Sequence, residues 1–208
     1  MNIPVVFEDD WILVADKPSG LLTIPSPKNE PRTLTSILND DAKEKGFEYR
    51  LHPCHRLDRD TSGLIIYAKG KSIQKKMMDE FRRHHVRKSY IAFVRGALNK
   101  NRGEIDIPIE RQSARTRYQV LERRRGYDIV EVHPLTGRTN QIRIHLRTIG
   151  YPILGESRYA FRRDFNIKAK RLCLHAGYIE FRHPHTGRIM KLSAGLPQEL
   201  KKFLARHA

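Results

Sequence analysis

The sequence predicts a single α+β domain over residues 1–208, built on a mostly antiparallel, mixed central sheet that is flanked by helices and loops. A chain of 208 residues is long enough to bury the core of one such domain. Short strand-like apolar runs are interrupted by only a few segments with helical spacing. No internal repeat, low-complexity linker or shift in composition marks a boundary that would divide the chain.

The N-terminal part predicts two strands, a loop and a helix. The strands are expected at residues 5–7 and 11–15, with an acidic turn between them, and the helix is expected over 33–45. A proline-rich loop separates the second strand from the helix. The prolines of the loop are Pro18, Pro25, Pro27 and Pro31, and the apolar face of the helix is formed by Leu34, Ile37, Leu38 and Ala42.

Three further elements complete the first half. The continuous apolar run 64–68 predicts a strand that is buried on both faces. A second helix is expected over 71–84, followed by a strand over 90–94. The side chains expected to face inward from this helix are Ile73, Met77, Met78 and Phe81.

The second half predicts two strand hairpins, a helix between them and a terminal helix. Thr139 is expected to cap the first of these helices, and Pro197 is expected to open the second. Three consecutive arginines, Arg123–Arg125, fall in the turn of the first hairpin. The expected elements are strands 117–121 and 127–133, helix 139–148, strands 176–181 and 189–192, and helix 198–206.

Positive charge is concentrated in one part of the chain. The protein has 40 basic and 23 acidic residues, which gives a net charge of +17. Residues 1–80 hold 12 basic and 13 acidic side chains, whereas residues 81–208 hold 28 and 10. A surplus confined in this way predicts a polyanion-binding face, for which nucleic acid is the first candidate and an anionic membrane surface the second. A basic ribosome-associated protein without any catalytic activity has the same composition.

Several classes of protein are disfavoured by the sequence. No run approaches the roughly 20 apolar residues of a membrane span, and the acidic N-terminus does not resemble a signal peptide. We therefore expect a soluble, cytoplasmic protein. Cys54 and Cys173 are too few for a disulfide framework, and neither has a metal ligand nearby at zinc spacing, so that no metal is expected.

A polar loop leads into the most apolar run of the chain. In this loop Asp58 lies between Arg56 and Arg59, and small residues follow at Thr61, Ser62 and Gly63. An acid flanked by two arginines can stay ionised at the edge of a buried strand, and small neighbours allow a ligand to approach closely. A salt-bridged turn is the structural alternative, although one carboxylate does not account for both arginines.

A second polar cluster lies at the start of the helix expected over 139–148. Arg143 is one turn from Asn140 on this helix, and Arg138 lies near its N-terminus. A solvated basic helix is the simple interpretation. However, Gly137 breaks the entry, and polar residues crowd the first turns beside apolar ones, so that Arg143 could reach a buried carboxylate as its ion partner.

These two segments, in this order, resemble the signature motifs of the RluA-type pseudouridine synthases, which isomerise uridine in RNA. Three further segments resemble motifs of the same family, so that the resemblance spans residues 11 to about 187. The matching segments are Leu13–Leu21 with its Lys-Pro-x-Gly motif, His55–Leu64, Lys88–Gly96 with Tyr90, Thr136–His145, and Leu174–Ala176 with His183-Pro184. The resemblance implies a pseudouridine synthase-like catalytic domain in a short form that lacks the N-terminal RNA-binding domain of many relatives.

Two positions depart from the family pattern. Asn140 stands where the family more usually has histidine, and Glu156 stands where aspartate is usual. Neither position is the implied catalytic carboxylate, so we expect these departures to affect fine positioning rather than the reaction.

The resemblance implies a role for each site residue. Asp58 is the implied catalytic carboxylate, acting either as nucleophile or as base toward the ribose, with Arg143 as its ion partner. Tyr90 is implied to stack on the uracil and to remove a ring proton, although it could equally be a core tyrosine. Arg56 is implied to fill the space left by the flipped-out base. The residues expected to bind substrate are His55, Arg56, Thr61, Arg138 and Gln141.

We expect the partner to be a ribosomal or transfer RNA stem-loop, bound by a monomer without cofactor. Three basic clusters are expected to face RNA phosphates and to make binding strongly salt-dependent. A non-catalytic RNA-binding factor is the main alternative, and a metal-dependent nuclease using Asp58 and Asp60 is a weaker one. The basic clusters are Arg82, Arg83, Arg87 and Lys88; Arg123 to Arg125; and Arg158, Arg162, Arg163, Lys168, Lys170 and Arg171.

Overall fold

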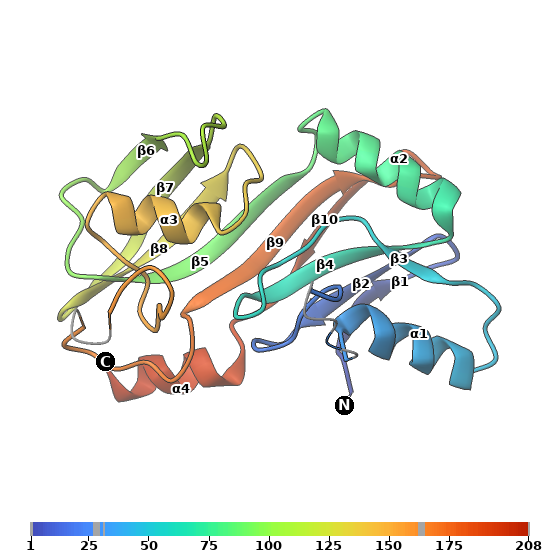
Figure 1. Cartoon of the computed structure of the whole chain (residues 1–208), viewed down its shortest axis with the longest axis horizontal. Coiled ribbons are helices and arrows are strands. Elements are labelled where there is room, and N and C mark those ends of the chain that lie inside the picture. The colour runs from blue at the N-terminus through green and yellow to red at the C-terminus, as the bar shows by residue number, and fades with distance from the viewer. Residues whose placement is uncertain (1, 27–29, 31, 162–164, 208) are drawn as a thin grey trace. The chain divides into compact units, whose positions relative to one another are not determined.

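The structure, a computed structural model, describes residues 2–26, 30, 32–161 and 165–207. The predicted Pro27 and Pro31 of the N-terminal loop lie outside these residues. The chain divides into two compact units, of which unit 1 comprises Met1–Arg87 and Tyr178–Ala194, and unit 2 comprises Lys88–Gly177 and Gly195–Ala208. Each unit contains antiparallel strands and two of the helices, which confirms the predicted α+β class (Figure 1).

The strands of unit 1 follow the order β1-β2-β4-β9, with β3 also paired to β4 and β10 paired to β9. The pairings β1–β2, β2–β4, β3–β4 and β9–β10 are antiparallel, and the last confirms the second predicted hairpin. The strand β9 begins in unit 2 and ends in unit 1. These elements are β1 (Val5–Glu8), β2 (Ile12–Lys17), β3 (Leu51–Pro53), β4 (Ser62–Lys69), β9 (Leu174–Arg182) and β10 (Ile189–Ser193).

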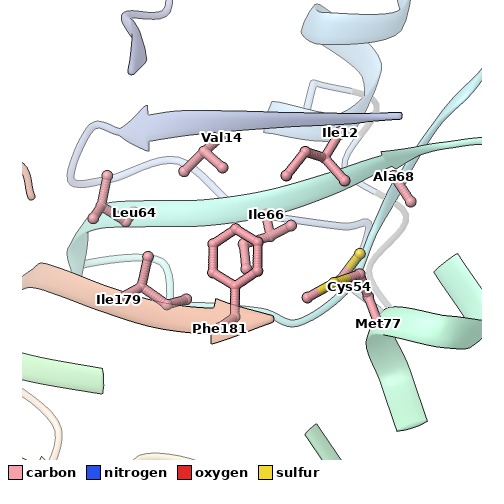
Figure 2. Close-up of a cluster of buried hydrophobic side chains, with 9 residues drawn as sticks. All are labelled: Ile12, Val14, Cys54, Leu64, Ile66, Ala68, Met77, Ile179 and Phe181. Atoms are coloured by element: carbon pink, nitrogen blue, oxygen red, sulfur yellow. The ribbon is translucent and has the colours of Figure 1, made fainter. Parts of the chain in front are cut away.

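Strand β4 is buried on both faces, as its continuous apolar run predicts. Alternate residues of β4 point to opposite faces of the sheet. One face packs into a cluster shared with β2, β9 and helix α2 (Lys71–Arg82). On the other face, the Tyr67 hydroxyl hydrogen-bonds Thr35 of helix α1 (Leu34–Glu44) at 3.0 Å. The cluster on the first face consists of Ile12, Val14, Cys54, Leu64, Ile66, Ala68, Met77, Ile179 and Phe181 (Figure 2).

The two helices of unit 1 bury most, but not all, of the side chains predicted to face inward. Helix α1 buries the four predicted residues and begins with a capping box between Thr33 and Ser36. Helix α2 buries Met77, but the inward position predicted for Met78 is wrong, because that side chain is 44% exposed. Adjacent helical residues point about 100° apart, so the stripe of Ile73, Met77 and Phe81 turns Met78 toward solvent.

The strands of unit 2 follow the order β9-β5-β8-β7-β6. The predicted hairpin is confirmed by the antiparallel β7–β8 pairing, but its strands are longer than expected, so that Arg123 and Arg124 lie in β7 rather than in the turn. Strand β6 was not predicted, because Ile105 is its only buried residue and the apolar signal is therefore weak. These elements are β5 (Arg87–Arg95), β6 (Arg102–Asp106), β7 (Arg115–Arg124) and β8 (Tyr127–Pro134).

Helices α3 (Gln141–Thr148) and α4 (Gln198–Arg206) cover opposite faces of the unit 2 strands. Phe203 of α4 packs on Phe93 of β5, with their ring centroids 5.7 Å apart. On the other face, two side chains of α3 bond the hydroxyl of Thr116 in β7. None of the helices in the described residues is long and apolar enough to cross a membrane.

Candidate active site

The predicted catalytic loop of unit 1 connects β3 to β4. Asp58 is half-buried in this loop, and its carbonyl oxygen accepts a hydrogen bond from Thr61 N at 3.1 Å. Gly63 then enters β4 with φ of 121°, a conformation that L residues with a side chain rarely adopt. The bond from Thr61 N to the Asp58 carbonyl therefore closes a turn immediately before the buried strand.

The Lys-Pro-x-Gly segment holds this loop from one side. Lys17 is fully buried, and its ammonium donates to the carbonyl oxygens of Pro18 at 2.9 Å, Leu21 at 2.6 Å and Arg59 at 2.9 Å. Gly20 N also donates to the Arg59 carbonyl, at 2.9 Å. A buried ammonium needs all of its donors satisfied, so these carbonyls fix the segment and the loop together.

Thr23 and Ser19 hold the same loop at neighbouring positions. The Thr23 hydroxyl donates to the Leu57 carbonyl at 3.1 Å and accepts from Leu57 N at 3.2 Å. The Ser19 hydroxyl donates to the Asp60 carbonyl at 2.7 Å. The backbone is therefore held on both sides of Asp58 by residues that lie 34 to 41 positions earlier in the chain.

The other predicted residues of the loop differ in their environments. His55 orders the loop, because its Nε2 accepts from Ile66 N at 3.1 Å and its ring packs on Phe81. Arg56 is exposed, whereas Arg59 forms an ion pair with Glu30. Thr61 is only 2% exposed, and its hydroxyl has no hydrogen-bond partner among the residues that the structure describes. A buried hydroxyl without a partner is costly, which is typical of a group that a ligand satisfies.

In unit 2, Gln141 organises the entry to α3. Its carboxamide oxygen accepts from the Thr136 hydroxyl at 2.7 Å and from Arg138 N at 3.0 Å. Its nitrogen donates to the Arg115 carbonyl and the Thr116 hydroxyl, both at 2.9 Å. The side chain of Arg138 is exposed, with its Nε donating to the Ser113 carbonyl.

Arg143 lies in the first turn of α3, is buried, and hydrogen-bonds Glu156 and Asn140. Its Nε and Nη2 donate to the two carboxylate oxygens of Glu156 at 2.8 and 2.7 Å. Its Nη1 donates to Asn140 Oδ1 at 2.8 Å. Both positions that depart from the RluA-type pattern therefore contact this one guanidinium, a connection that sequence reasoning missed.

Asn140, rather than the predicted Thr139, is the N-cap residue of α3. It adopts the left-handed conformation, with φ of 56° and ψ of 22°, and its side chain makes no capping hydrogen bond. Asparagine tolerates this conformation better than most residues. The side chain is therefore directed to Arg143 instead of to the helix end.

The environment of Glu156 keeps it ionised. Burial by itself would raise the pKa of Glu156, but hydrogen bonds from Arg143 and from the backbone of Arg158 and Tyr159 outweigh this effect and lower the pKa below its ordinary value. The preceding Gly155 has φ of 78°, and a Cβ there would lie 1.9 Å from the Arg171 carbonyl oxygen. Only glycine therefore fits the turn that brings Glu156 to Arg143.

Tyr90 lies in β5 on the sheet face that carries α3. It is buried and pairs in register with Val132 of β8, which in turn faces Tyr118 of β7. Because Thr116 is two residues from Tyr118 and contacts α3, the register places Tyr90 on the same side of the strands as α3.

Two histidines of the segments that resemble family motifs form hydrogen bonds that stabilise the fold. His183 Nδ1 accepts from Thr186 N at 3.0 Å and its Nε2 donates to Asp9 at 2.8 Å, so that this side chain stabilises its turn. His145 is fully buried between the Thr116 hydroxyl and the Ile107 carbonyl. Within the described residues, no group of three or more histidine, cysteine, aspartate or glutamate side chains could hold a metal ion.

Several members of the predicted basic clusters have partners within the protein. Arg123 pairs with the buried Asp128 at 3.0 Å, Arg124 pairs with Glu122, and Arg82 pairs with Asp79. Arg158 lies over the Tyr159 ring. Arg162 and Arg163 lie outside the described residues.

Known proteins resemble this chain in sequence and in fold. Residues 11–148 match the family described as RNA pseudouridylate synthase. The dual-specificity RNA pseudouridine synthase RluA of Pasteurella multocida is 36% identical over 92% of both chains. The uncharacterized RNA pseudouridine synthase YlyB of Bacillus subtilis is 34% identical over 98% of this chain and 72% of its own. The structure of human RNA Pseudouridylate Synthase Domain Containing 4 aligns with a TM-score of 0.83 and 26% identity, over 97% of this chain and 92% of the other.

Proposed function

Because this chain belongs to the RNA pseudouridylate synthase family and isomerises uridine in RNA to pseudouridine, we propose that Asp58 is the carboxylate that acts on the ribose of the target uridine. The reaction breaks the bond from ribose to the ring nitrogen, turns the uracil, and joins the ribose to a ring carbon. The ring carbon loses a proton and the ring nitrogen gains one, so that the product is an isomer of uridine and no net oxidation or reduction takes place. A carboxylate beside the ribose serves this chemistry either as nucleophile or as base.

The observation that carries the proposal is the fixed backbone around a half-buried carboxylate. Hydrogen bonds from Lys17, Thr23 and Ser19 hold the carbonyls on both sides of Asp58. Preorganisation of a reacting group removes the need to order it during the reaction. A merely structural salt-bridged turn does not require this many anchors on one short loop.

Arg143 and Tyr90 are the proposed partners of Asp58 in the reaction. A guanidinium provides two parallel N–H donors, a geometry that orients a carboxylate and keeps it ionised. The aromatic ring of Tyr90 is suited to stacking on uracil, and its hydroxyl to removing the ring proton.

Five further residues of the two segments are proposed to take part in substrate binding. The unsatisfied hydroxyl of Thr61 supports a polar contact with the nucleotide. The exposed Arg56 is suited to filling the space of a flipped-out base, since unstacking costs a few kcal/mol. His55 and Gln141 contribute by ordering the loop and the α3 entry, and Arg138 by its exposed guanidinium.

We infer that the substrate is a ribosomal or transfer RNA stem-loop. The basic residues concentrated in 81–208 support phosphate contacts, and loops are where a uridine leaves its stack most easily. One relative, from Nitrosomonas europaea, carries the name ribosomal large subunit pseudouridine synthase D and is 33% identical over 97% of this chain and 64% of its own. The enzyme is proposed to act as a cytoplasmic monomer.

Tritium release from RNA labelled at uridine C5 tests the assignment, because joining this carbon to the ribose displaces its hydrogen. Asp58→Asn is expected to lower release at least about a thousandfold. Asp60→Asn, in the same loop, is the matched control and is expected to retain activity. Full activity in Asp58→Asn would contradict the assignment. Pseudouridine mapping of total RNA with and without the gene identifies the target.

A further inference from the structure

Two buried side chains hold the guanidinium of Arg143 along two of its edges. Glu156 accepts from Nε and Nη2 at 2.8 and 2.7 Å, and Asn140 accepts from Nη1 at 2.8 Å. These contacts occupy three of the five N–H groups of the guanidinium. The plane of the guanidinium, and the direction in which its other Nη hydrogens point, are therefore determined within unit 2.

Both partners are themselves fixed by the fold. Glu156 Oε1 also accepts from Arg158 N at 2.8 Å, and the turn before it admits only glycine at position 155. The left-handed backbone of Asn140 sets the direction in which its side chain leaves the start of α3. Rotation of Glu156 would also break its bond from Arg158 N, so the orientation of Arg143 is preset rather than induced by substrate.

The ion pair is poorly explained by stability alone. The side chains of Arg143 and Glu156 are only 6% and 1% exposed. Removing two charges from water offsets most of their attraction, so a buried ion pair is weak evidence of a stabilising role. Both carboxylate oxygens of Glu156 and the amide oxygen of Asn140 accept from one guanidinium, a geometry that is instead suited to fixing the orientation of Arg143.

We propose that Glu156 and Asn140 are positioning residues for the isomerisation, which fix the orientation of the Arg143 guanidinium. This inference rests on the proposed role of Arg143 as the partner of Asp58. Glu156 balances the positive charge of Arg143. The guanidinium of Arg143 would therefore orient the Asp58 carboxylate mainly through hydrogen bonds rather than through net positive charge.

The kinetic constants of tritium release test the proposal. Glu156→Gln and Asn140→Gly are each expected to lower kcat at least about tenfold while KM for RNA changes less than about threefold. Glycine at 140 keeps the left-handed backbone and removes only the amide. Asp128→Asn is the matched control, because this carboxylate is also fully buried and paired with an arginine of unit 2, and its kcat per folded molecule is expected to stay unchanged.

An Arg143→Gln background separates positioning from general structural damage. If both residues act through the guanidinium, adding Glu156→Gln or Asn140→Gly to this background changes kcat by less than about twofold. An equal loss in both backgrounds, or a wild-type kcat in both single variants, would overturn the inference. In that outcome an inactive Asp58→Asn variant still leaves the proposed function intact, whereas an active one contradicts the proposed function itself.

Discussion

Replacing Thr23 with valine is expected to loosen the Asp58 loop without changing the shape of the core. Valine is close in size to threonine but lacks the hydroxyl that bonds both the N–H and the carbonyl of Leu57. Both bonds are buried, and a net contribution of about 0.5–1.5 kcal/mol each predicts a loss of about 2 kcal/mol. For a chain of 208 residues this corresponds to a fall in Tm of about 4–8 °C.

Activity is expected to fall together with stability in this variant. If the whole loss of about 2 kcal/mol in stability appears as local opening of the loop, kcat per folded molecule falls by up to about 30-fold, since about 1.4 kcal/mol corresponds to a factor of ten. Thermal melting and tritium release measure the two effects separately.

Asn39→Leu provides the control for this experiment. The Asn39 carboxamide also bonds both the N–H and the carbonyl of one backbone residue, Leu51, in the same unit. This variant is expected to lose comparable stability and to keep its kcat. A Thr23→Val variant that melts early but retains full kcat would show that the anchoring of the loop does not matter for the reaction.

Three further outcomes follow from single contacts. Gly155→Ala is expected to destabilise the protein by more than about 3 kcal/mol, because its Cβ would clash with the Arg171 carbonyl at a positive φ; a wild-type melting curve would contradict this. Burial lowers the pKa of His145, so the neutral side chain contributes to the free energy of unfolding above about pH 6.5. This contribution is lost as the pH falls toward the lowered pKa. Between about pH 7.5 and about pH 5.5, Tm should therefore drop more in the wild type than in His145→Gln. RNA affinity should fall steeply with salt, and Arg125→Ala should reduce that slope more than Arg123→Ala, because Arg123 is already paired with Asp128.

The parts of the fold that the sequence predicted are those in which neighbours along the chain determine the outcome. The inward face of α1, the bounds of α4 and the two-sided burial of β4 follow from spacing and caps within single segments. Strand β6 was missed because it is an edge strand with one buried residue, so that its pairing partner rather than its own pattern makes it a strand.

For the site, the sequence alone specifies the available chemical groups, namely a carboxylate in an arginine-rich loop, a tyrosine on a strand and an arginine at a helix entry. The tertiary structure decided what holds them. Thr23 reaches Leu57 across 34 positions, and Glu156 reaches Arg143 across 13 with a strained turn between. Such contacts depend on where distant backbone segments meet, which no local pattern encodes, because a single hydrogen bond adds too little energy to leave a signal in composition or periodicity.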